Sequence, residues 1–370
     1  MKIAVSCGGT GGHMFPGLAV ASELLRRGHR VAVVLSGRAV EAERSAADLP
    51  AGAEALVVPS RPVSLRRPSS VPAVAASFAA ARRELRAFAP DALLAMGSYT
   101  SLAPVLAART LGVPVVLHEA NAVPGAAVAA LARFAKTVCT CFPGMERFFP
   151  KGARIADTGL PLRAEFARGT GASRTVPGKF SVLVMGGSQG ARDLNRGVVR
   201  AFAEAGGPPP DRIVHLAGTR NEAEVRALWD GSGLRGAGTE IEVVGFEHDM
   251  ARRYAEADLC ISRAGASSCF ELALAGLPAV LVPLPGLARD HQTRNAEAMA
   301  ARKAALVFPQ KDLLDPGSRK RFAALVEDLR ARAGGPFPSR AALREAALAA
   351  ARPDAAARVA GEVELAAKTR

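Results

Sequence analysis

Residues 2–13 read Lys-Ile-Ala-Val-Ser-Cys-Gly-Gly-Thr-Gly-Gly-His, an apolar strand pattern that ends in a glycine cluster, and a helical pattern begins at Pro16. Residues 181–190 repeat this plan as Ser-Val-Leu-Val-Met-Gly-Gly-Ser-Gln-Gly before a second helical stretch. The two glycine clusters lie 178 residues apart, about half the chain. A strand that passes through a glycine turn into a helix typically opens a parallel α/β sheet, so the sequence predicts two such sheets in tandem.

Both halves continue as short aliphatic segments that alternate with alanine-rich helical patterns. The further strands that we expect are residues 31–35, 92–96, 113–117, 137–141, 213–216, 241–244, 259–262, 279–282 and 305–307. This alternation predicts an α/β fold of two doubly wound parallel sheets, with ligands in a cleft at the carboxyl ends of the strands.

The chain length of 370 residues exceeds what one hydrophobic core usually serves, so we expect two domains. We place them at residues 1–160 and 161–345, with the glycine- and proline-rich residues 159–179 as the linker. The alanine-rich residues 346–370 have helical spacing, and we expect this helix to pack back on the first domain.

The charge and the amino-acid composition of the chain limit which kinds of partner and function we expect. The net charge is +14, and 40 of the 48 basic residues are Arg, which indicates codon bias as much as selection for charge. A basic surface favours anionic partners such as a nucleotide or an anionic membrane leaflet. With 5% aromatic residues and no dense basic run, nucleic-acid binding is disfavoured. We find neither a membrane-spanning apolar stretch nor a signal peptide, so we expect a cytoplasmic protein.

Metal and disulfide chemistry are not predicted. The five cysteines are scattered and form no Cys-x-x-Cys pair, which favours buried, reduced thiols. The chain also has no Asp-x-Asp pair, the usual clamp for a divalent metal on a nucleotide-sugar diphosphate. Arginines, hydroxyls and helix N-termini would have to stabilise such a leaving group instead.

The two glycine loops favour a phosphate-bearing ligand, because glycine lets backbone amides approach an anion closely. Neither loop gives a convincing dinucleotide pattern Gly-x-Gly-x-x-Gly, and no Gly-Lys-Ser/Thr motif occurs. Tight strand-to-helix turns remain the alternative interpretation of each loop.

Polar side chains gather at two predicted strand ends of the first half. His13 follows the first strand and is either a general base, because histidine titrates near neutral pH, or a capping group. Residues 118–121, His-Glu-Ala-Asn, follow the strand 113–117 and form either part of a site or a solvated turn.

The sharpest signal of the second half is residues 262–271, Ser-Arg-Ala-Gly-Ala-Ser-Ser-Cys-Phe-Glu, where a strand ends and a helix begins. The helix N-terminus would attract a diphosphate, and Glu271 could accept hydrogen bonds from both ribose hydroxyls. An ordinary capping arrangement is the alternative. Residues 290–295, Asp-His-Gln-Thr-Arg-Asn, add amide and charged groups at another helix start.

This ordered series of motifs resembles the MurG family, the undecaprenyl-diphospho-muramoylpentapeptide N-acetylglucosaminyltransferases of peptidoglycan synthesis. The matching stretches are residues 8–19, 90–101, 118–121, 186–192, 264–278 and 290–292. The resemblance implies a GT-B fold and an inverting transferase that needs no metal or cofactor. Such an enzyme moves N-acetylglucosamine from UDP to the C4 hydroxyl of the muramic sugar of lipid I, giving lipid II.

The resemblance also implies roles for individual residues. His13 is the expected general base, and Glu119 is the second choice, as a base or as the group that orients His13. Glu247 would contact the uracil edge through its backbone. The substrate contacts implied in all are Thr10, Gly11, Gly12, Asn121, Arg163, Ser188, Gln189, Glu247, Ala266, Ser267, Ser268, Cys269, Phe270, Glu271 and Gln292.

Three positions depart from the family pattern. Leu160 stands where the family usually has Asn, Ala120 where it usually has Gln, and Ser98 where Gly is more usual. Leu160 and Ala120 keep one alternative open, a related UDP-sugar transferase with another lipid or glycoside acceptor. A UDP-sugar 2-epimerase or a non-catalytic nucleotide-sugar binder of similar architecture is the other alternative.

One helical segment suggests a membrane surface. Apolar residues recur along it at helical spacing with arginines beside them: Val71, Val74, Phe78, Leu85, Phe88, Arg66, Arg67, Arg82, Arg83 and Arg86. Such a stripe can lie on an anionic leaflet, which together with the resemblance implies a peripheral protein on the cytoplasmic face of the cell membrane. An ordinary helix that packs on the sheet is the alternative.

Overall fold

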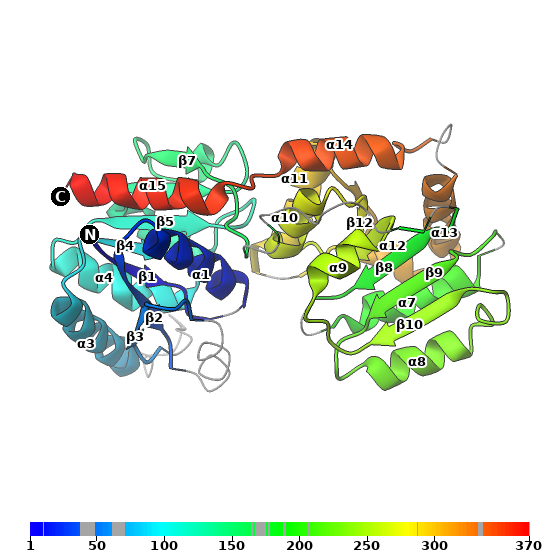
Figure 1. Cartoon of the computed structure of the whole chain (residues 1–370), viewed down its shortest axis with the longest axis horizontal. Coiled ribbons are helices and arrows are strands. Elements are labelled where there is room, and N and C mark those ends of the chain that lie inside the picture. Colours follow the sequence, from blue (N-terminus) through cyan, green and yellow to red (C-terminus); the bar gives the residue numbers. More distant parts are fainter. Residues whose placement is uncertain are drawn as a thin grey trace. The chain divides into compact units, whose positions relative to one another are not determined.

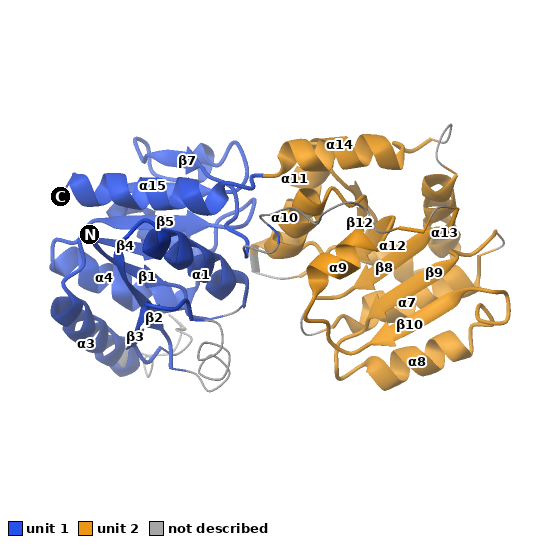
Figure 2. Ribbon diagram, in the orientation of Figure 1, with its two compact units in different colours: residues 1–167, 352–370 blue, residues 168–351 orange. Residues whose placement is uncertain are grey.

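The chain forms two compact units in the computed structural model (Figure 2). Unit 1 comprises residues 1–167 and 352–370, and unit 2 comprises residues 168–351. These limits lie several residues beyond the divisions expected after residues 160 and 345. The structure describes residues 1–9, 11–37, 49–60, 71–163, 166, 175–176, 178–187, 190–205, 207–286, 288–331 and 336–369.

Unit 1 is built on a seven-stranded parallel sheet in the order β3-β2-β1-β4-β5-β6-β7 (Figure 1). The strands are β1 (Lys2–Ser6), β2 (Arg30–Leu35), β3 (Glu54–Val57), β4 (Ala92–Ala95), β5 (Val115–Glu119), β6 (Thr137–Thr140) and β7 (Ile155–Asp157). In the register of the central strands, Ile3 lies opposite Val31 on one side and Ala92 on the other. The central strands are aliphatic and almost wholly buried, as a parallel sheet covered on both faces requires.

Helices cover this sheet and connect its strands. They are α1 (Gly11–Arg26), α3 (Val71–Phe88), η2 (Tyr99–Ser101), α4 (Leu102–Thr110), α5 (Ala126–Leu131), η3 (Ala132–Phe134), η4 (Glu146–Phe148) and α15 (Ala355–Lys368). The C-terminal helix α15 packs on α1 and adds Val359 and Val363 to the core of unit 1. Glu364 of this helix accepts a hydrogen bond from Arg27 at 3.0 Å and lies 2.7 Å from Nε2 of His29.

Unit 2 repeats the plan with a six-stranded parallel sheet in the order β10-β9-β8-β11-β12-β13. The strands are β8 (Ser181–Met185), β9 (Arg212–Leu216), β10 (Glu240–Val244), β11 (Leu259–Ser262), β12 (Ala279–Leu281) and β13 (Leu306–Val307). The helices are α7 (Arg192–Ala203), α8 (Glu222–Asp230), α9 (Met250–Ala255), α10 (Ala266–Ala275), η5 (Ala288–Asp290), α11 (His291–Ala301), α12 (Gln310–Leu314), α13 (Pro316–Arg330) and α14 (Arg340–Ala350).

A buried polar network crosses the core of unit 2. Trp229 donates from its indole nitrogen to Nδ1 of His215 at 3.0 Å, and Nε2 of His215 lies 3.1 Å from Oδ1 of Asn195. Asn195 in turn donates to the carbonyl of Ala217 at 2.9 Å. Burial lowers the pKa of His215 to about 3, so its ring is neutral and both nitrogens are satisfied.

The predicted α/β fold is confirmed, and each predicted strand coincides with an observed one within two residues at either end. The prediction that His118 and Glu119 follow their strand is wrong, because β5 extends to Glu119. The short strands β3 and β7 were not predicted. They form the two edges of the first sheet and carry partly exposed side chains, which weakens their apolar pattern.

In each sheet the strand order reverses beside the first strand of its unit, between β1 and β4 and between β8 and β11. Ligands of open α/β sheets bind outside the carboxyl ends of the strands at such a point. The loops that follow β1, β4, β8 and β11 are therefore where the candidate site is built.

Candidate active site

His13 lies in the first turn of α1, two residues after the helix begins at Gly11, and its side chain is partly buried. The carbon Cδ2 of its ring lies 3.5 Å from the place that a Cβ on Gly97 would occupy. The imidazole therefore lies beside Gly97, in the loop that follows β4. Gly11 and Gly12 share the same turn, whereas Thr10 lies outside the described residues.

A hydrogen bond ties the segment after β4 to the loop after β1, because Thr100 donates to the carbonyl of Gly8 at 2.7 Å. Within the segment after β4, Ser101 donates to the carbonyl of Gly97. Ser98, where the family usually has glycine, has a φ of 66°, a left-handed conformation that glycine adopts at lower cost. The departure at Ser98 therefore keeps the glycine-like backbone of this loop.

Glu119 is 3% exposed, and the amides of its own loop saturate its carboxylate. Oε1 accepts from the backbone N–H of Asn121 at 2.9 Å and from its side-chain amide at 3.0 Å. Oε2 accepts from the backbone N–H of Gly125 at 2.8 Å. Burial raises the pKa of Glu119, and these hydrogen bonds oppose the rise. The carboxylate thus shapes the loop from 119 to 125 and presents Asn121 at its start.

His118 is buried and contacts interior groups through Nε2. Its Nε2 lies 3.2 Å from the carbonyl of Gly159 and 3.6 Å from the sulfur of Cys141. Burial lowers the pKa of His118 to about 4, so the ring is neutral at pH 7. Two of the residues that depart from the pattern of the resembled family are buried as well. Ala120 directly follows Glu119 in the sequence, and Leu160 directly follows Gly159.

Arg163 is held against the helix that carries His13. Its guanidinium lies 5.2 Å from the ring centre of Phe15 and 5.3 Å from that of Phe166, which are cation–π distances. The side chain is partly buried rather than free in solvent. Arg163 is therefore a positive charge fixed within unit 1 near the start of α1.

In unit 2, the loop after β8 depends on its glycines. A Cβ on Gly190, whose φ is 70°, would lie 2.4 Å from the carbonyl oxygen of Ala217, so only glycine fits. Gly186 is similarly closed off by the backbone of Ala191. Ser188 and Gln189, the predicted ligands of this loop, lie outside the described residues.

Helix α10 opens directly after β11 with Gly265 as its N-cap, which has no side chain to occupy the first amides. The amides of Ala266, Ser267 and Ser268 therefore begin the helix in the arrangement that attracts a diphosphate. The side chains of Cys269 and Phe270 are buried in the core, and burial raises the pKa of the Cys269 thiol to about 12. These two predicted ligands can contribute only through their backbone.

Arg263 adds a buried positive charge next to this helix start. Its side chain is 5% exposed and donates to the carbonyl of Val282 at 3.0 Å. The Nε atom has no hydrogen-bond partner among the described residues. Burial lowers the pKa of Arg263 to about 10, so it still carries a charge at neutral pH. Sequence reasoning quoted this residue but did not select it.

The side chains of Glu271 and Gln292 are both oriented by hydrogen bonds from neighbouring elements of unit 2. Oε2 of Glu271 accepts a hydrogen bond of 2.9 Å from the hydroxyl of Tyr254. Oε1 of Gln292 accepts from the backbone amides of Leu284 at 2.9 Å and Ala264 at 3.3 Å. Because two N–H groups require an acceptor there, the amide nitrogen of Gln292 faces the other way, as a donor.

The side chain of Glu247 serves its own loop. Oε1 accepts from the backbone amides of His248 at 2.9 Å and Asp249 at 3.0 Å, and Oε2 accepts from Arg253 at 2.6 Å. The carboxylate is thus committed to shaping residues 245–249. This arrangement agrees with a ligand contact made through the backbone of Glu247 rather than its side chain.

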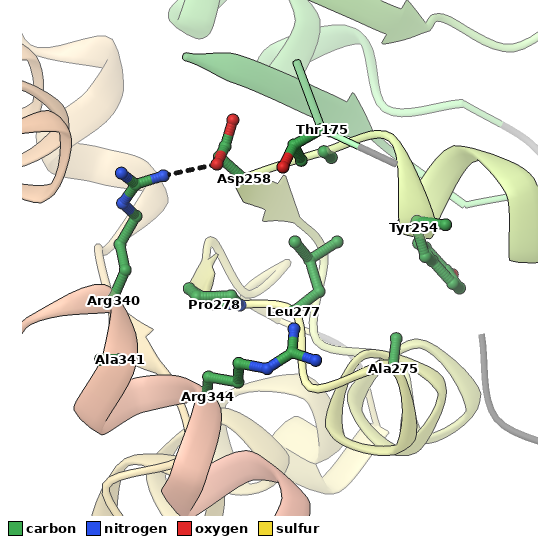
Figure 3. A pocket seen from close by; sticks show the side chains of 11 residues that line it. Thr175, Tyr254, Asp258, Ala275, Leu277, Pro278, Arg340, Ala341 and Arg344 are labelled. Atoms are coloured by element: carbon green, nitrogen blue, oxygen red, sulfur yellow. Dashed lines mark hydrogen bonds and ion pairs between the residues drawn. The ribbon is translucent and has the colours of Figure 1, made fainter. Parts of the chain in front are cut away.

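A cavity of about 150 Å³ in unit 2 lies away from these groups (Figure 3). Asp258 precedes β11 and Pro278 precedes β12, so this cavity borders the amino ends of the strands. Arg340 of α14 reaches Asp258 with an ion pair of 2.7 Å across it. The cavity is therefore at the opposite edge of the sheet from the predicted ligand groups.

The predicted membrane stripe on α3 is partly wrong. Leu85 and Phe88 are buried, and α3 packs on α4, so these two side chains cannot reach a lipid surface. Phe78 is only partly buried and lines a surface hollow with Ala79, Arg82, Arg83, Arg86 and Ala87. Arg66, Arg67 and the side chain of Val71 lie outside the described residues.

The described residues also bear on metal binding, membrane insertion and cysteine chemistry. No group of three or more His, Cys, Asp or Glu side chains is arranged to hold a metal ion. No helix within the described ranges is long and apolar enough to cross a bilayer. All five cysteines are buried, which confirms the predicted burial of their thiols.

Comparison with known proteins assigns the class. Residues 3–140 match the glycosyltransferase family 28 N-terminal domain, and residues 181–351 match the family 28 C-terminal domain. Together with the two Rossmann-like sheets, these matches make the chain a glycosyltransferase of family 28 with the GT-B fold.

Individual relatives specify the family further. The UDP-N-acetylglucosamine–N-acetylmuramyl-(pentapeptide) pyrophosphoryl-undecaprenol N-acetylglucosamine transferase of Halorhodospira halophila is 41% identical, covering 97% of this chain and 96% of the relative. The protein of the same name from Ectopseudomonas mendocina is 40% identical over 84% of this chain and 85% of its own. The crystal structure of Acinetobacter baumannii MurG matches with a TM-score of 0.76 and 31% identity, covering 98% of this chain and 99% of that one. The chain belongs to the MurG family.

Proposed function

We propose that this chain transfers N-acetylglucosamine from UDP-N-acetylglucosamine to the C4 hydroxyl of the muramic sugar of lipid I, which produces lipid II. The observation that carries the proposal is the 41% identity to a transferase of that name over 97% of the chain. The helix start at Gly265, with the charge of Arg263 beside it, is suited to the diphosphate of such a donor.

Transfer occurs with inversion and begins at the acceptor hydroxyl. As its oxygen attacks C1 of the sugar, its proton passes to His13, and the bond from C1 to the diphosphate oxygen breaks on the opposite face. His13 suits this role because it is a partly buried histidine at the carboxyl end of the first sheet. Glu119 is less suited, because both of its oxygens already accept hydrogen bonds.

The leaving UDP develops negative charge, which groups of unit 2 stabilise. The first amides of α10 and the buried guanidinium of Arg263 supply positive potential for the phosphates, so no divalent metal is needed. Glu271 binds the ribose hydroxyls, and the backbone at Glu247 reads the uracil edge. The amide nitrogen of Gln292 donates to the donor sugar. Asn121 and Arg163 contribute from unit 1.

The enzyme acts as a peripheral protein on the cytoplasmic face of the cell membrane, where it serves cell-wall growth, cell shape and division. Phe78 with Arg82, Arg83 and Arg86 gives α3 an apolar centre with basic neighbours, which suits an anionic leaflet. Phe78→Asp should therefore weaken binding to anionic liposomes about tenfold and leave UDP affinity unchanged. Unaltered liposome binding in a flotation assay would exclude this face of α3, and Leu314→Asp, on the exposed surface of unit 2, is the matched control.

The test of the function is a transfer assay with UDP-N-acetylglucosamine and a short-chain lipid I analogue in the presence of EDTA. We expect stoichiometric UDP release and a β-linked disaccharide product identified by mass spectrometry and NMR. Conversion of the UDP-sugar without acceptor would indicate a 2-epimerase instead. Donor binding without transfer to the lipid I analogue would indicate a different acceptor. Product that forms only when EDTA is omitted and Mg²⁺ is supplied would overturn the metal-independent mechanism.

A further inference from the structure

Helix α9 contacts two parts of the donor site through consecutive side chains. Arg253 points to the loop that follows β10, and Tyr254 points to the first turns of α10. The helix itself is short, from Met250 to Ala255, and begins with Asp249 accepting from the backbone amide of Arg252 at 3.0 Å. Neither Arg253 nor Tyr254 is among the predicted ligands.

Arg253 fastens the loop of Glu247 to the sheet. Its side chain is 6% exposed and forms a two-pronged contact with Glu242 of β10, at 2.6 and 2.9 Å. Its Nε donates to Glu247 at 2.6 Å, and Glu247 in turn accepts the amides of His248 and Asp249. A planar guanidinium that bridges two carboxylates gives a rigid link, because its donors are fixed relative to one another.

Tyr254 fastens the carboxylate of Glu271. The tyrosine is 3% exposed, and its hydroxyl donates to Oε2 of Glu271 at 2.9 Å and lies 3.7 Å from the sulfur of Met185. Glu271 is only partly buried, so its carboxylate borders solvent. The hydrogen bond from the buried Tyr254 hydroxyl fixes the orientation of this carboxylate. A rigid buried phenol loses little entropy in making this contact.

We propose that α9 fixes the spacing between the base-reading and ribose-reading parts of the donor site, with Arg253 and Tyr254 as positioning residues. This inference rests on the proposed donor site of Glu247 and Glu271. Arg253 sets the loop whose backbone reads uracil, and Tyr254 sets the carboxylate that accepts from the ribose. Uridine specificity is then divided between two neighbouring residues that do not touch the nucleotide.

The test is a crossed binding experiment with UDP, 2′-deoxy-UDP and CDP, measured by calorimetry on the full chain. Tyr254→Phe removes only a hydroxyl and should reduce the preference for UDP over 2′-deoxy-UDP about three- to tenfold. Its preference for UDP over CDP should not change. Arg253→Lys keeps the positive charge but removes the planar guanidinium that bridges the two carboxylates. This variant should reduce the preference for UDP over CDP by a similar factor, about three- to tenfold, without altering the preference for UDP over 2′-deoxy-UDP.

A second variant and a control variant distinguish a specific positioning role from a general destabilisation of the fold. Glu247→Gln breaks the same link from the loop side and should reproduce the shift of Arg253→Lys. Arg252→Ala removes a neighbouring arginine that is about half exposed and pairs with Glu256, and should change neither preference. In transfer assays, Tyr254→Phe should raise KM for the donor and leave kcat within about twofold.

The outcomes separate this inference from the function itself. If both preferences fall together in Tyr254→Phe and in Arg253→Lys, or if neither falls, α9 has no positioning role, although the unaltered chain still makes product. If the unaltered chain shows no preference for UDP over CDP and 2′-deoxy-UDP, the donor site is misplaced and the inference fails with it.

Discussion

Glu119 of unit 1 and Glu271 of unit 2 are the same residue type, yet they are held very differently. Glu119 is the last residue of β5, and Glu271 lies within α10. Glu119 is buried and accepts three hydrogen bonds from its own loop. Glu271 is partly exposed, and its Oε2 accepts a hydrogen bond from a tyrosine of another helix. A buried carboxylate whose two oxygens accept from its own loop shapes that loop, whereas a partly exposed carboxylate can still bind a ligand.

The two buried histidines extend the comparison. His215 in unit 2 lies in a network in which each ring nitrogen has a partner. His118 in unit 1 has partners at Nε2, but its buried Nδ1 has none among the described residues. The ring of His215 is thus satisfied at both nitrogens, whereas the ring of His118, next to Glu119 in the chain, keeps one buried nitrogen without a partner among the described residues.

The largest expected effect is loss of stability in acid. Burial lowers the pKa of His118 to about 4 and of His215 to about 3, whereas both titrate near 6.5 when unfolded. Above pH 7 neither state binds the protons, so stability is complete. As the pH falls below 6.5, the two histidines bind protons in the unfolded chain but not in the folded chain. The free energy of unfolding therefore decreases with falling pH until the pKa values of the folded state are reached.

At pH 5 this loss should be about 2 kcal/mol for each histidine. Denaturant melts between pH 4.5 and 7.5 measure it, and His118→Gln should remove the share that belongs to unit 1. If the stability of the unaltered chain is flat across this range, the two rings are not held neutral.

Next in size is the effect of Glu119 on stability. Glu119→Ala leaves the amides of Asn121 and Gly125 buried without their acceptor and should cost about 3 kcal/mol. Glu119→Gln keeps one acceptor but turns an N–H₂ group toward an amide, and should cost about 1–2 kcal/mol. Thermal and chemical melts check both values.

The matched control is Glu54→Gln, an exposed glutamate of the same unit paired with Arg30, which should cost under about 0.5 kcal/mol. Equal losses at Glu54 and Glu119 would contradict the view that the Glu119 carboxylate organises its loop.

The opposite pattern is expected at Glu271. Glu271→Gln weakens the acceptor for the ribose hydroxyls and should raise KM for UDP-N-acetylglucosamine about tenfold, with kcat within about threefold. Because Glu271 is partly exposed, the free energy of unfolding should change by less than about 1 kcal/mol. Steady-state kinetics alongside melts distinguish this result from a structural role like that of Glu119.

Much of the fold could be predicted because the central strands are buried on both faces and so are nearly pure aliphatic runs. Val182, Leu183 and Val184 of β8 illustrate such a run. The edge strands β3 and β7 escaped prediction because they are short and because charged residues, the partly exposed Glu54 and the exposed Asp157, interrupt their apolar pattern. Glu119 was placed beyond its strand for a related reason: its side chain is satisfied by its loop while its backbone stays in the sheet.

The candidate site could be predicted only as far as local motifs reach. Sequence spacing alone predicts that Gly265 precedes a helix and that Glu271 lies within it. The contacts of Tyr254 with Glu271 and of Arg253 with Glu247 are not, because each joins residues of different elements that only the folded unit brings together. Burial of Cys269 and Phe270 likewise follows from which face of α10 meets the core.

The central claim is that unit 1 carries the chemistry and unit 2 holds the donor. His13→Ala tests it most directly, with the affinity for UDP-N-acetylglucosamine and the single-turnover transfer rate measured on the same preparation. We predict a donor affinity within about twofold of the unaltered chain and a transfer rate reduced about 10³-fold, since general-base removal typically costs 10²–10⁴. An unchanged rate, or a loss of donor affinity that accounts for the loss of rate, would contradict the account.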